Sequence, residues 1–237
     1  MIKQRTTIGV IPTIIWGDPS VSVFIAVHGF MSNKEDLVIE RLAQIVTNNG
    51  YQMISFDLPQ HGERQALSTQ FELQNCVDDL NIILSFVKKS WSMISLFACS
   101  IGVYLSLQAY KNESLKQSLF LSPVIDMRQM IEKMMTTEDV SIKRLKREKK
   151  IVTTSGQVFN WDDYQYVLEN PIVSWNNKTA VLYGSLDDQC EYALIKMFTE
   201  KYHCEFAIIE GGEHFFHTEE QLTQFTSWLE KTLICDA

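Results

Sequence analysis

The stretch "SLFACSIGVYLS" at residues 95–106 decides the fold. The short apolar run that ends at Ala98 is typical of a buried strand, and the stretch after the serine, with Val103, Leu105, Leu107 and Ala109, suits a helix. Ser100 therefore stands at a predicted strand-to-helix corner. A sharp corner needs small residues two positions before and two positions after it, because these positions crowd each other, and Ala98 and Gly102 meet that need. The alternative is an ordinary helix N-cap, a position that serine also favours.

The composition limits the class of protein. The 237 residues, 46% of them apolar, suit one α/β domain with room for an insertion. A formal net charge of -8 disfavours a nucleic-acid partner, and no run of apolar residues is long enough for a membrane span. The five cysteines show no C-x-x-C pairing, which is typical of reduced thiols in a cytoplasm. The sequence thus indicates a cytoplasmic protein with no metal site and no cofactor.

Strand-like and helix-like stretches alternate along the chain. The first 18 residues indicate a β-hairpin and no signal peptide. Predicted strands then cover residues 22–29, 51–57, 91–98, 118–124, 178–184 and 204–211, and predicted helices cover residues 34–50, 71–89, 189–202 and 217–233. A capping box of Ser32 and Glu35 is predicted to start the first of these helices. The alternation predicts one α/β domain over residues 1–237, with a mostly parallel central sheet and helices on both faces.

Residues 126–175 break this rhythm and are predicted to form a helical cap or lid insertion. Met127, Met130, Ile131 and Met134 recur at helical spacing there. This apolar face either packs on the domain or lines an acyl-chain site, since thioethers adapt to irregular shapes. On the second interpretation, Met130 and Met134 are the candidate substrate-binding residues. The run from 143 to 150 holds six of the 21 basic residues and is interpreted as a solvated helix face or an attractor of anionic substrates.

Two further polar groups follow predicted strands, at the edge where open α/β sheets place their sites. "VLYGSLDDQC" (181–190) supplies Asp187 and Asp188, and "IIEGGEHFF" (208–216) supplies His214. A serine hydroxyl needs a base, and the base needs an orienting acid, so Ser, Asp and His in this chain order favour a nucleophilic site. Asp188 remains the alternative acid.

A fourth part of the predicted site would stabilise the negative charge that forms on a carbonyl oxygen during the reaction. "VHGFMSN" (27–33) follows the first long strand, and Gly29 allows close approach of its backbone. The backbone N–H groups of Phe30 and Ile101 are the candidate oxyanion hole. His28 and His61 are interpreted as structural residues that bond loop backbone, and the Cys99 side chain is expected to point into the core.

The chain resembles the α/β-hydrolases, and among these it is most similar to small bacterial carboxylesterases and acylglycerol lipases. The matching pieces are "HGF" at 28–30, "FDLPQHGER" at 56–64, "ACSIG" at 98–102, "YGSLDDQC" at 183–190 and "GGEH" at 211–214. The resemblance covers the predicted sheet from about residue 20 to 234 and leaves the insertion unmatched. The resemblance implies Ser100 as nucleophile, His214 as base, and Asp187, three residues after Gly184, as acid.

Two positions depart from the family pattern. Ala98 replaces the first glycine of the G-x-S-x-G elbow, and Gln60 stands where the family's D-x-P-G-H-G loop has a glycine. The second departure affects the loop that shapes the floor near the site.

The residues and the resemblance together predict a serine hydrolase that cleaves small-molecule carboxylic esters through an acyl-enzyme. A thioesterase or peptidase with the same triad, and a catalytically silent ligand-binding protein of the same fold, are the alternatives. The oligomeric state and the natural substrate do not follow from the sequence.

Overall fold

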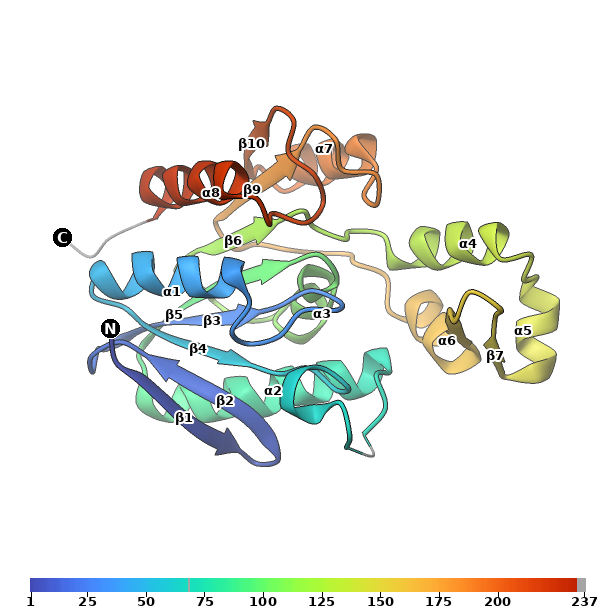
Figure 1. Cartoon of the computed structure of the whole chain (residues 1–237), viewed down its shortest axis with the longest axis horizontal. Helices are drawn as coiled ribbons and strands as arrows, with labels where there is room; N and C mark the ends of the chain where they lie inside the picture. Colours follow the sequence, from blue (N-terminus) through green and yellow to red (C-terminus); the bar gives the residue numbers. More distant parts are fainter. Residues whose placement is uncertain (68, 234–237) are drawn as a thin grey trace.

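The protein is described by a computed structural model that covers residues 1–67 and 69–233. Its main sheet has eight strands in the order β1-β2-β4-β3-β5-β6-β9-β10 (Figure 1). The strands are β1 (Lys3–Ile8), β2 (Ile11–Trp16), β3 (Ser22–Val27), β4 (Gln52–Phe56), β5 (Met93–Cys99), β6 (Ser118–Leu121), β9 (Thr179–Gly184) and β10 (Glu205–Ile209). Strands β1 and β2 form the predicted antiparallel hairpin, and all pairs from β4 to β10 are parallel. The predicted mostly parallel sheet is therefore confirmed.

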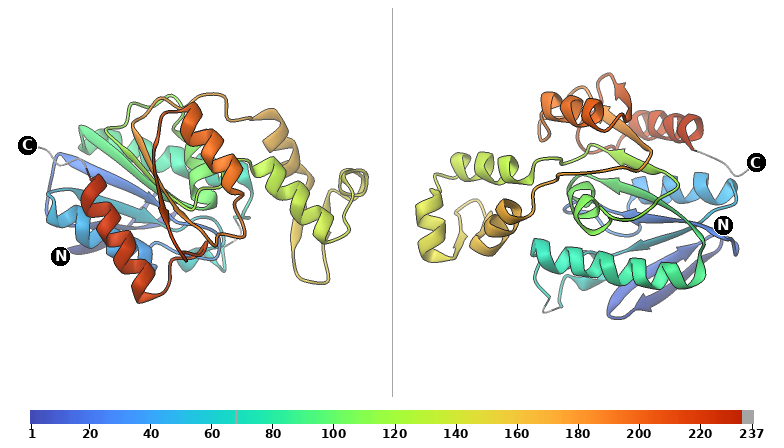
Figure 2. Two further views of the ribbon diagram at one scale, coloured as in Figure 1. Left: turned by 90° about the horizontal axis from the view of Figure 1, so that it is seen from above. Right: turned by 180° about the vertical axis from the view of Figure 1, so that it is seen from behind.

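Helices cover both faces of this sheet, as predicted (Figure 2). The helices are α1 (Leu37–Asn48), α2 (Leu73–Ser90), α3 (Ile101–Ala109), α7 (Tyr192–Lys201) and α8 (Glu219–Thr232), with a short 3-10 turn η1 (Gly62–Arg64). On β3, Ile25 packs into the core layer under α2 and α3, whereas Phe24 packs into the layer under α1 and α8. This alternation follows from the period of two along a strand, and it explains why every residue of β3 is buried. No helix within the described residues is long and apolar enough to cross a bilayer.

The start of α1 differs from the prediction. Its N-cap is Asp36, whose carboxylate accepts from the backbone N–H of Leu37, and the predicted capping box of Ser32 and Glu35 is wrong. Ser32 instead donates to the Asp36 carboxylate at 2.6 Å. The residues before the helix bond outside it: the N–H of Lys34 donates to the buried carboxylate of Asp57, and the N–H of Glu35 donates to the Asn33 side chain.

Residues 126–175 form a separate set of elements between β6 and β9 that projects from one end of the molecule (Figure 1). They are α4 (Met127–Thr137), α5 (Ile142–Glu148), the hairpin β7 (Lys150–Val152) with β8 (Val158–Asn160), and α6 (Trp161–Glu169). None of the described residues in this range joins the main sheet. The basic run lies mostly on α5, and the ammonium groups of Lys146, on this helix, and of Lys149, just after it, stand over the Trp161 ring.

This insertion is tied to the body at the N-terminus of α2. The backbone N–H of Leu73 donates to the Asp163 carboxylate at 2.7 Å, and the Asn160 amide donates to Glu72 at 3.2 Å. Burial raises the pKa of Asp163 to about 6, and the nearby charges of Glu72 and Asp162 add to that effect, although the Leu73 hydrogen bond opposes it. The charged carboxylate thus costs stability at neutral pH.

We expect Asp163→Asn to stabilise the protein at pH 7.5. A carboxyl whose folded pKa is raised from its ordinary 3.8 to about 6 contributes full stability below pH 3.8, and this contribution is lost as the pH rises through 6. A neutral amide can still accept from Leu73 and avoids that loss. The melting temperature should rise by a few degrees at pH 7.5, on the order of 1–2 kcal/mol, with no gain at pH 4. Thermal unfolding at both pH values, with Asp162→Asn as the matched control, checks this, and a lower melting temperature at pH 7.5 would contradict it.

Candidate functional site

Ser100 stands at the corner between β5 and α3, with φ 51° and ψ -126°. A positive φ is unfavourable for any residue other than glycine, so the surrounding hydrogen bonds must hold the Ser100 backbone in this conformation. The N–H of Ser100 donates to the Leu121 carbonyl at 3.0 Å, and its own carbonyl accepts from Val124 at 3.1 Å. The corner is therefore fixed to the end of β6 and to the segment that follows it.

The glycine after the corner is required for a reason that the sequence did not reveal. A Cβ on Gly102 would lie 2.7 Å from the carbonyl oxygen of His28 and 2.8 Å from that of Val27. The close neighbour is thus the end of β3, whereas the sequence argument invoked crowding against Ala98. Gly29 also packs tightly, since a Cβ there would lie 3.1 Å from the Ser100 Cβ.

Three predicted side chains meet at the carboxyl edge of the sheet. The Ser100 hydroxyl lies 2.9 Å from His214 Nε2, and His214 Nδ1 lies 2.9 Å from Asp187 Oδ2. The His214 and Asp187 side chains are both buried. Asp188 is exposed, and it is Asp187 that contacts the imidazole. The structure thus brings Ser100, Asp187 and His214 together.

The hydrogen bonds around Asp187 set the state of the imidazole. Asp187 Oδ1 accepts from the backbone N–H groups of Gln189 and Cys190, both at 2.9 Å, and Oδ2 faces the imidazole. A carboxylate only accepts, so the proton is assigned to His214 Nδ1, and Nε2 faces the Ser100 hydroxyl with a lone pair. The arrangement can therefore accept a proton from the serine.

The loops that carry Asp187 and His214 are joined by backbone contact. A Cβ on Gly184 would lie only 2.4 Å from the Gly212 carbonyl oxygen. That same oxygen accepts from the N–H of Leu186 at 2.8 Å, and the N–H of Ser185 donates to Ile209 at 3.0 Å. Two glycines thus allow the ends of β9 and β10 to approach closely, and this sets the position of the acid relative to the imidazole.

The loop after β3 is held by two histidines with the same bonding pattern. His28 Nε2 accepts from the N–H of Leu58, and His61 Nε2 accepts from the N–H of Met31, both at 3.0 Å. The other nitrogen of each ring lies within 2.8 Å of a backbone carbonyl, that of Gly29 or Pro59.

Burial lowers the pKa of His28 to about 4 and also lowers that of His61. Both rings are thus neutral, with the structural role predicted for them. Neither ring bonds the N–H of Phe30, which has no hydrogen-bond partner among the described residues.

A buried carboxylate that sequence reasoning missed organises the adjoining loop. Asp57 is fully buried and accepts from the Lys34 ammonium at 2.5 Å and from the N–H of Glu63 at 3.0 Å. Gly62 packs directly on it, because a Cβ there would lie 2.3 Å from the carboxyl carbon. Burial lowers the pKa of Lys34, but its hydrogen bonds to Asp57 and Glu63 outweigh that effect, and the pKa is raised.

Gln60, where the resemblance described above leads one to expect a glycine, adopts φ 59°. The backbone therefore keeps the conformation that favours glycine, at some cost in strain. The Gln60 side chain compensates by accepting from the N–H of Phe71 at 3.0 Å, just before α2. The turn thus carries a residue with a side chain at a positive φ.

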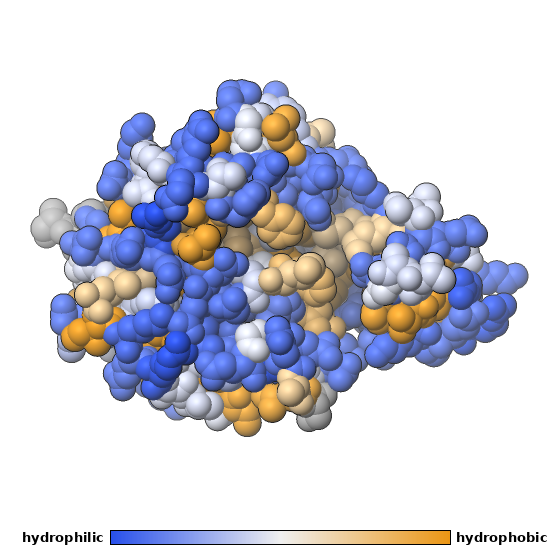
Figure 3. Space-filling view, in the orientation of Figure 1, coloured by the Kyte–Doolittle hydropathy of each residue, from blue (hydrophilic) through white to orange (hydrophobic). Residues whose placement is uncertain are grey.

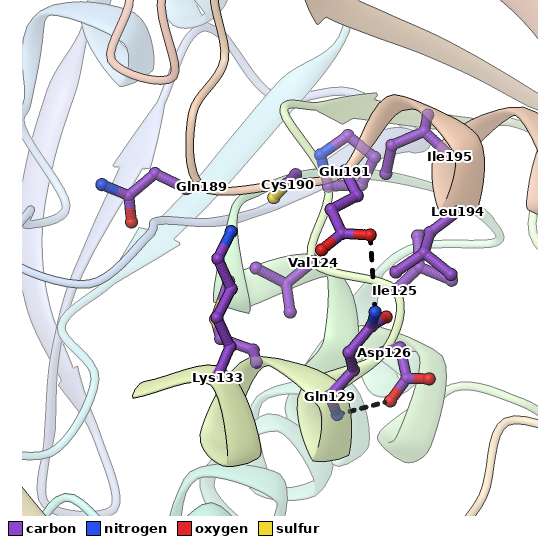
Figure 4. Close-up of a pocket in the computed structure, with 12 residues that line it drawn as sticks. Val124, Ile125, Asp126, Gln129, Lys133, Gln189, Cys190, Glu191, Leu194 and Ile195 are labelled. Atoms are coloured by element: carbon purple, nitrogen blue, oxygen red, sulfur yellow. Dashed lines mark hydrogen bonds between the residues drawn. The ribbon is translucent and has the colours of Figure 1, made fainter. Parts of the chain in front are cut away.

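A partly apolar pocket lies beside the three side chains. The space-filling view shows a hollow with apolar walls between the body and the insertion (Figure 3). Val124, whose N–H donates to the Ser100 carbonyl, and Cys190 line the pocket (Figure 4). Met130 of α4 also lines it. Met134 does not line this pocket, although both methionines are partly buried and pack against the same core. The two predicted substrate-binding methionines therefore differ in their access to the pocket.

Cys190 is a further residue at the site that the sequence did not single out. Its sulfur lies 3.9 Å from His214 Nδ1 and 3.7 Å from the carbonyl of Ser122. Burial, followed by the charge of Asp187, raises the pKa of this thiol. Burial likewise raises the pKa of Cys99 to about 12, and Cys99 packs against the core as expected. The four cysteines within the described residues are free, and Cys235 lies outside these residues.

No family model and no curated protein sequence matches the chain. Solved structures do match it. Est1E from Butyrivibrio proteoclasticus, solved with ferulic acid bound, is 16% identical with a TM-score of 0.74 and covers 96% of this chain and 98% of its own. Mouse alpha/beta hydrolase domain-containing protein 10 is 12% identical with a TM-score of 0.75, covering 98% of both chains.

An alpha-beta serine hydrolase homologue from Coxiella burnetii is 15% identical with a TM-score of 0.68, and the match covers 98% of this chain and 97% of the other. The strand order, the two helix layers and the similarity to these solved structures all indicate the same fold. The chain has the α/β-hydrolase fold, as the sequence predicted.

We expect Gly184→Ala to destabilise the protein through the contact with Gly212. The added methyl group has no room beside a backbone carbonyl, and overpacking of this kind costs about 1–3 kcal/mol. The melting temperature should fall by roughly 4–10 °C in thermal unfolding. Gly156→Ala is the control, because nothing lies within 4 Å of a Cβ there and only the strain of φ +88° is added. An equal or larger loss in the control would show that the Gly184 contact is not the cause.

Proposed function

We propose that this chain, which has the α/β-hydrolase fold, is a serine hydrolase that cleaves carboxylic esters through an acyl-enzyme. The observation that carries the proposal is the chain of two hydrogen-bond contacts, each 2.9 Å long, from the Ser100 hydroxyl through His214 to the Asp187 carboxylate. The serine also stands at a strained corner beside a helix N-terminus, where negative charge is favoured.

In the proposed reaction, Ser100 Oγ attacks the acyl carbon and His214 Nε2 takes the hydroxyl proton. The protonated imidazole then gives this proton to the leaving alcohol, and a water molecule hydrolyses the acyl-enzyme by the same route in reverse. Asp187 is already fully hydrogen-bonded, so its role is to orient the ring and to stabilise the positive charge that forms on it. None of these steps uses a cofactor.

The proposed oxyanion hole consists of the backbone N–H groups of Phe30 and Ile101. The Ile101 N–H is the first of α3, and the Phe30 N–H has no partner among the described residues. Gly29 in contact with the Ser100 Cβ brings the Phe30 peptide next to the nucleophile. Each donor would contribute on the order of 3 kcal/mol to the transition state.

The surroundings of Ser100 suit an ester with apolar parts. Phe30, Leu186 and Phe215 are adjacent in sequence to site residues and expose large apolar side chains. The pocket lined by Val124 and Cys190 extends to α4, where Met130 is the proposed contact to the acyl chain. Residues 126–175 would then act as the cap of the site. Est1E, which has the same fold, binds ferulic acid, and this supports an organic acid as one product of the reaction.

A fluorophosphonate tests the nucleophile. We expect the wild-type protein to gain the mass of one phosphonyl group, because the activated Ser100 hydroxyl attacks phosphorus as it would attack an acyl carbon. Intact-mass spectrometry measures this, and Ser100→Ala should remain unlabelled. Labelling of Ser100→Ala at the wild-type rate would refute the assignment.

Nitrophenyl ester hydrolysis tests the acid. Asp187→Asn should lower kcat by roughly 10³–10⁴, because an amide no longer holds the required imidazole tautomer. Asp188→Asn is the matched control and should remain near wild type, since its side chain is exposed. Thioester and amide substrates in the same assay distinguish the ester activity from the related acyl transfers. The assignment of Asp187 fails if the two variants lose activity equally.

Variants at Met130 and Met134 test whether the pocket binds the acyl chain. We expect Met130→Trp to fill the pocket and to lower kcat/KM for a nitrophenyl octanoate, relative to the acetate, by about tenfold or more. Met134→Trp, the same change on the same helix outside the pocket, should leave this ratio near wild type. Comparison of the two ratios checks the pocket, and an unchanged ratio for Met130→Trp would contradict the acyl-chain role.

A further inference from the structure

Three metal-ligating side chains from two loops converge beside Ser100. A carboxylate oxygen of Asp187, the sulfur of Cys190 and Nδ1 of His214 all lie within 4.8 Å of one another. His214 Nδ1 lies 2.9 Å from Asp187 Oδ2 and 3.9 Å from the Cys190 sulfur. This set combines an oxygen, a sulfur and a nitrogen ligand, all of which zinc accepts.

The spacing is close to that of a tetrahedral zinc site. With zinc bonds of about 2.0–2.3 Å, neighbouring ligand atoms lie roughly 3.3–3.6 Å apart. The Asp187 and His214 atoms would therefore separate by a few tenths of an ångström, and the sulfur would move closer to Nδ1 by a similar amount. The sulfur and the Asp187 oxygen, which lie within 4.8 Å of each other, would have to approach by up to about 1.2 Å. Side-chain rotation of Cys190 and Asp187 would have to provide this shift.

Access and charge also fit a metal ion. Cys190 lines the pocket beside the site, and Figure 4 shows its side chain among the residues around this opening. A carboxylate and a thiolate together balance the charge of one Zn²⁺, and water from the pocket can provide the fourth ligand. The ligands come from positions 187 to 214, so their spacing in the sequence does not match any short metal motif.

We propose that Asp187, Cys190 and His214 bind one Zn²⁺ ion, and that this ion keeps the site inactive. The metal takes the lone pair of Nδ1, so the ring proton moves to Nε2 and the thiol proton passes to solvent. Nε2 then presents a proton to the Ser100 hydroxyl and can no longer accept one. The inhibition rests on the proposed function, whereas the metal site itself does not.

Metal binding is tested in Ser100→Ala, which keeps all three ligands and needs no activity. After removal of metals with a chelator, Co²⁺ should give the visible bands of a tetrahedral site together with a thiolate-to-metal charge-transfer band. Zn²⁺ should compete with a chromophoric chelator at one ion per chain. Adding Cys190→Ser should remove the charge-transfer band and weaken zinc binding by at least about tenfold.

Cys204→Ser in the same background is the matched control. Cys204 directly precedes β10 and so lies at the strand end opposite to the one that leads to His214, and its loss should leave both signals in place. The proposal is overturned if zinc binds equally well to the Cys190→Ser and Cys204→Ser proteins, or if no charge-transfer band forms.

The inhibitory consequence is tested in proteins that retain Ser100. Zinc should lower the esterase rate of the wild-type protein by at least about tenfold, with recovery after addition of a chelator. The rate of Cys190→Ser, compared with its own metal-free rate, should fall much less. Zinc bound at the thiol without loss of rate would refute the inhibition. A wild-type protein that shows the cobalt spectrum but no esterase activity would refute the proposed function and leave the metal site standing.

Discussion

The contact between the backbones at Gly184 and Gly212 is the constraint on which the site depends. The hydrogen bonds at the corner between β5 and α3 fix Ser100, but the acid and the imidazole come from the ends of two other strands. Their separation of 2.9 Å requires β9 and β10 to end with their peptides in contact, and only glycine at position 184 leaves room for the Gly212 carbonyl. The parallel pairing of these strands, from Ala180 with Glu205 to Gly184 with Ile209, delivers both loops to the same edge.

The features predicted correctly from the sequence are those that local patterns encode. Apolar runs and helical periodicity gave the strands and helices, and parallel strands with crossover helices place all their carboxyl ends at one edge. Ser100, Asp187 and His214 each follow such a strand, so their convergence was predictable without knowledge of any contact. The distinction between Asp187 and Asp188 depended on spacing from Gly184, and the structure places Asp187 at the imidazole.

The features missed or mistaken depend on contacts between segments distant in sequence. Ser32 and Glu35 match a capping box, yet the Asp57 carboxylate binds the Lys34 N–H from another loop, and the helix starts later. The neighbour that excludes a side chain at Gly102 is the end of β3, about 75 residues earlier, which no local pattern shows. The link from Asp163 to α2 was equally invisible, because a buried carboxylate in an insertion resembles any acidic residue on a helix.

At Cys190 the peptide groups and the side chain make different contacts with the site. Asp187 Oδ1 is oriented by the N–H groups of Gln189 and Cys190, and the Tyr183 hydroxyl donates to the Cys190 carbonyl at 2.8 Å. Both contacts use only the peptide groups, so almost any residue at position 190 would hold the loop equally well. The thiol therefore adds no orientation to the acid. Its distinguishing property is the sulfur itself, 3.9 Å from an imidazole nitrogen and next to a carboxylate, and that is a property of a ligand set for a metal ion.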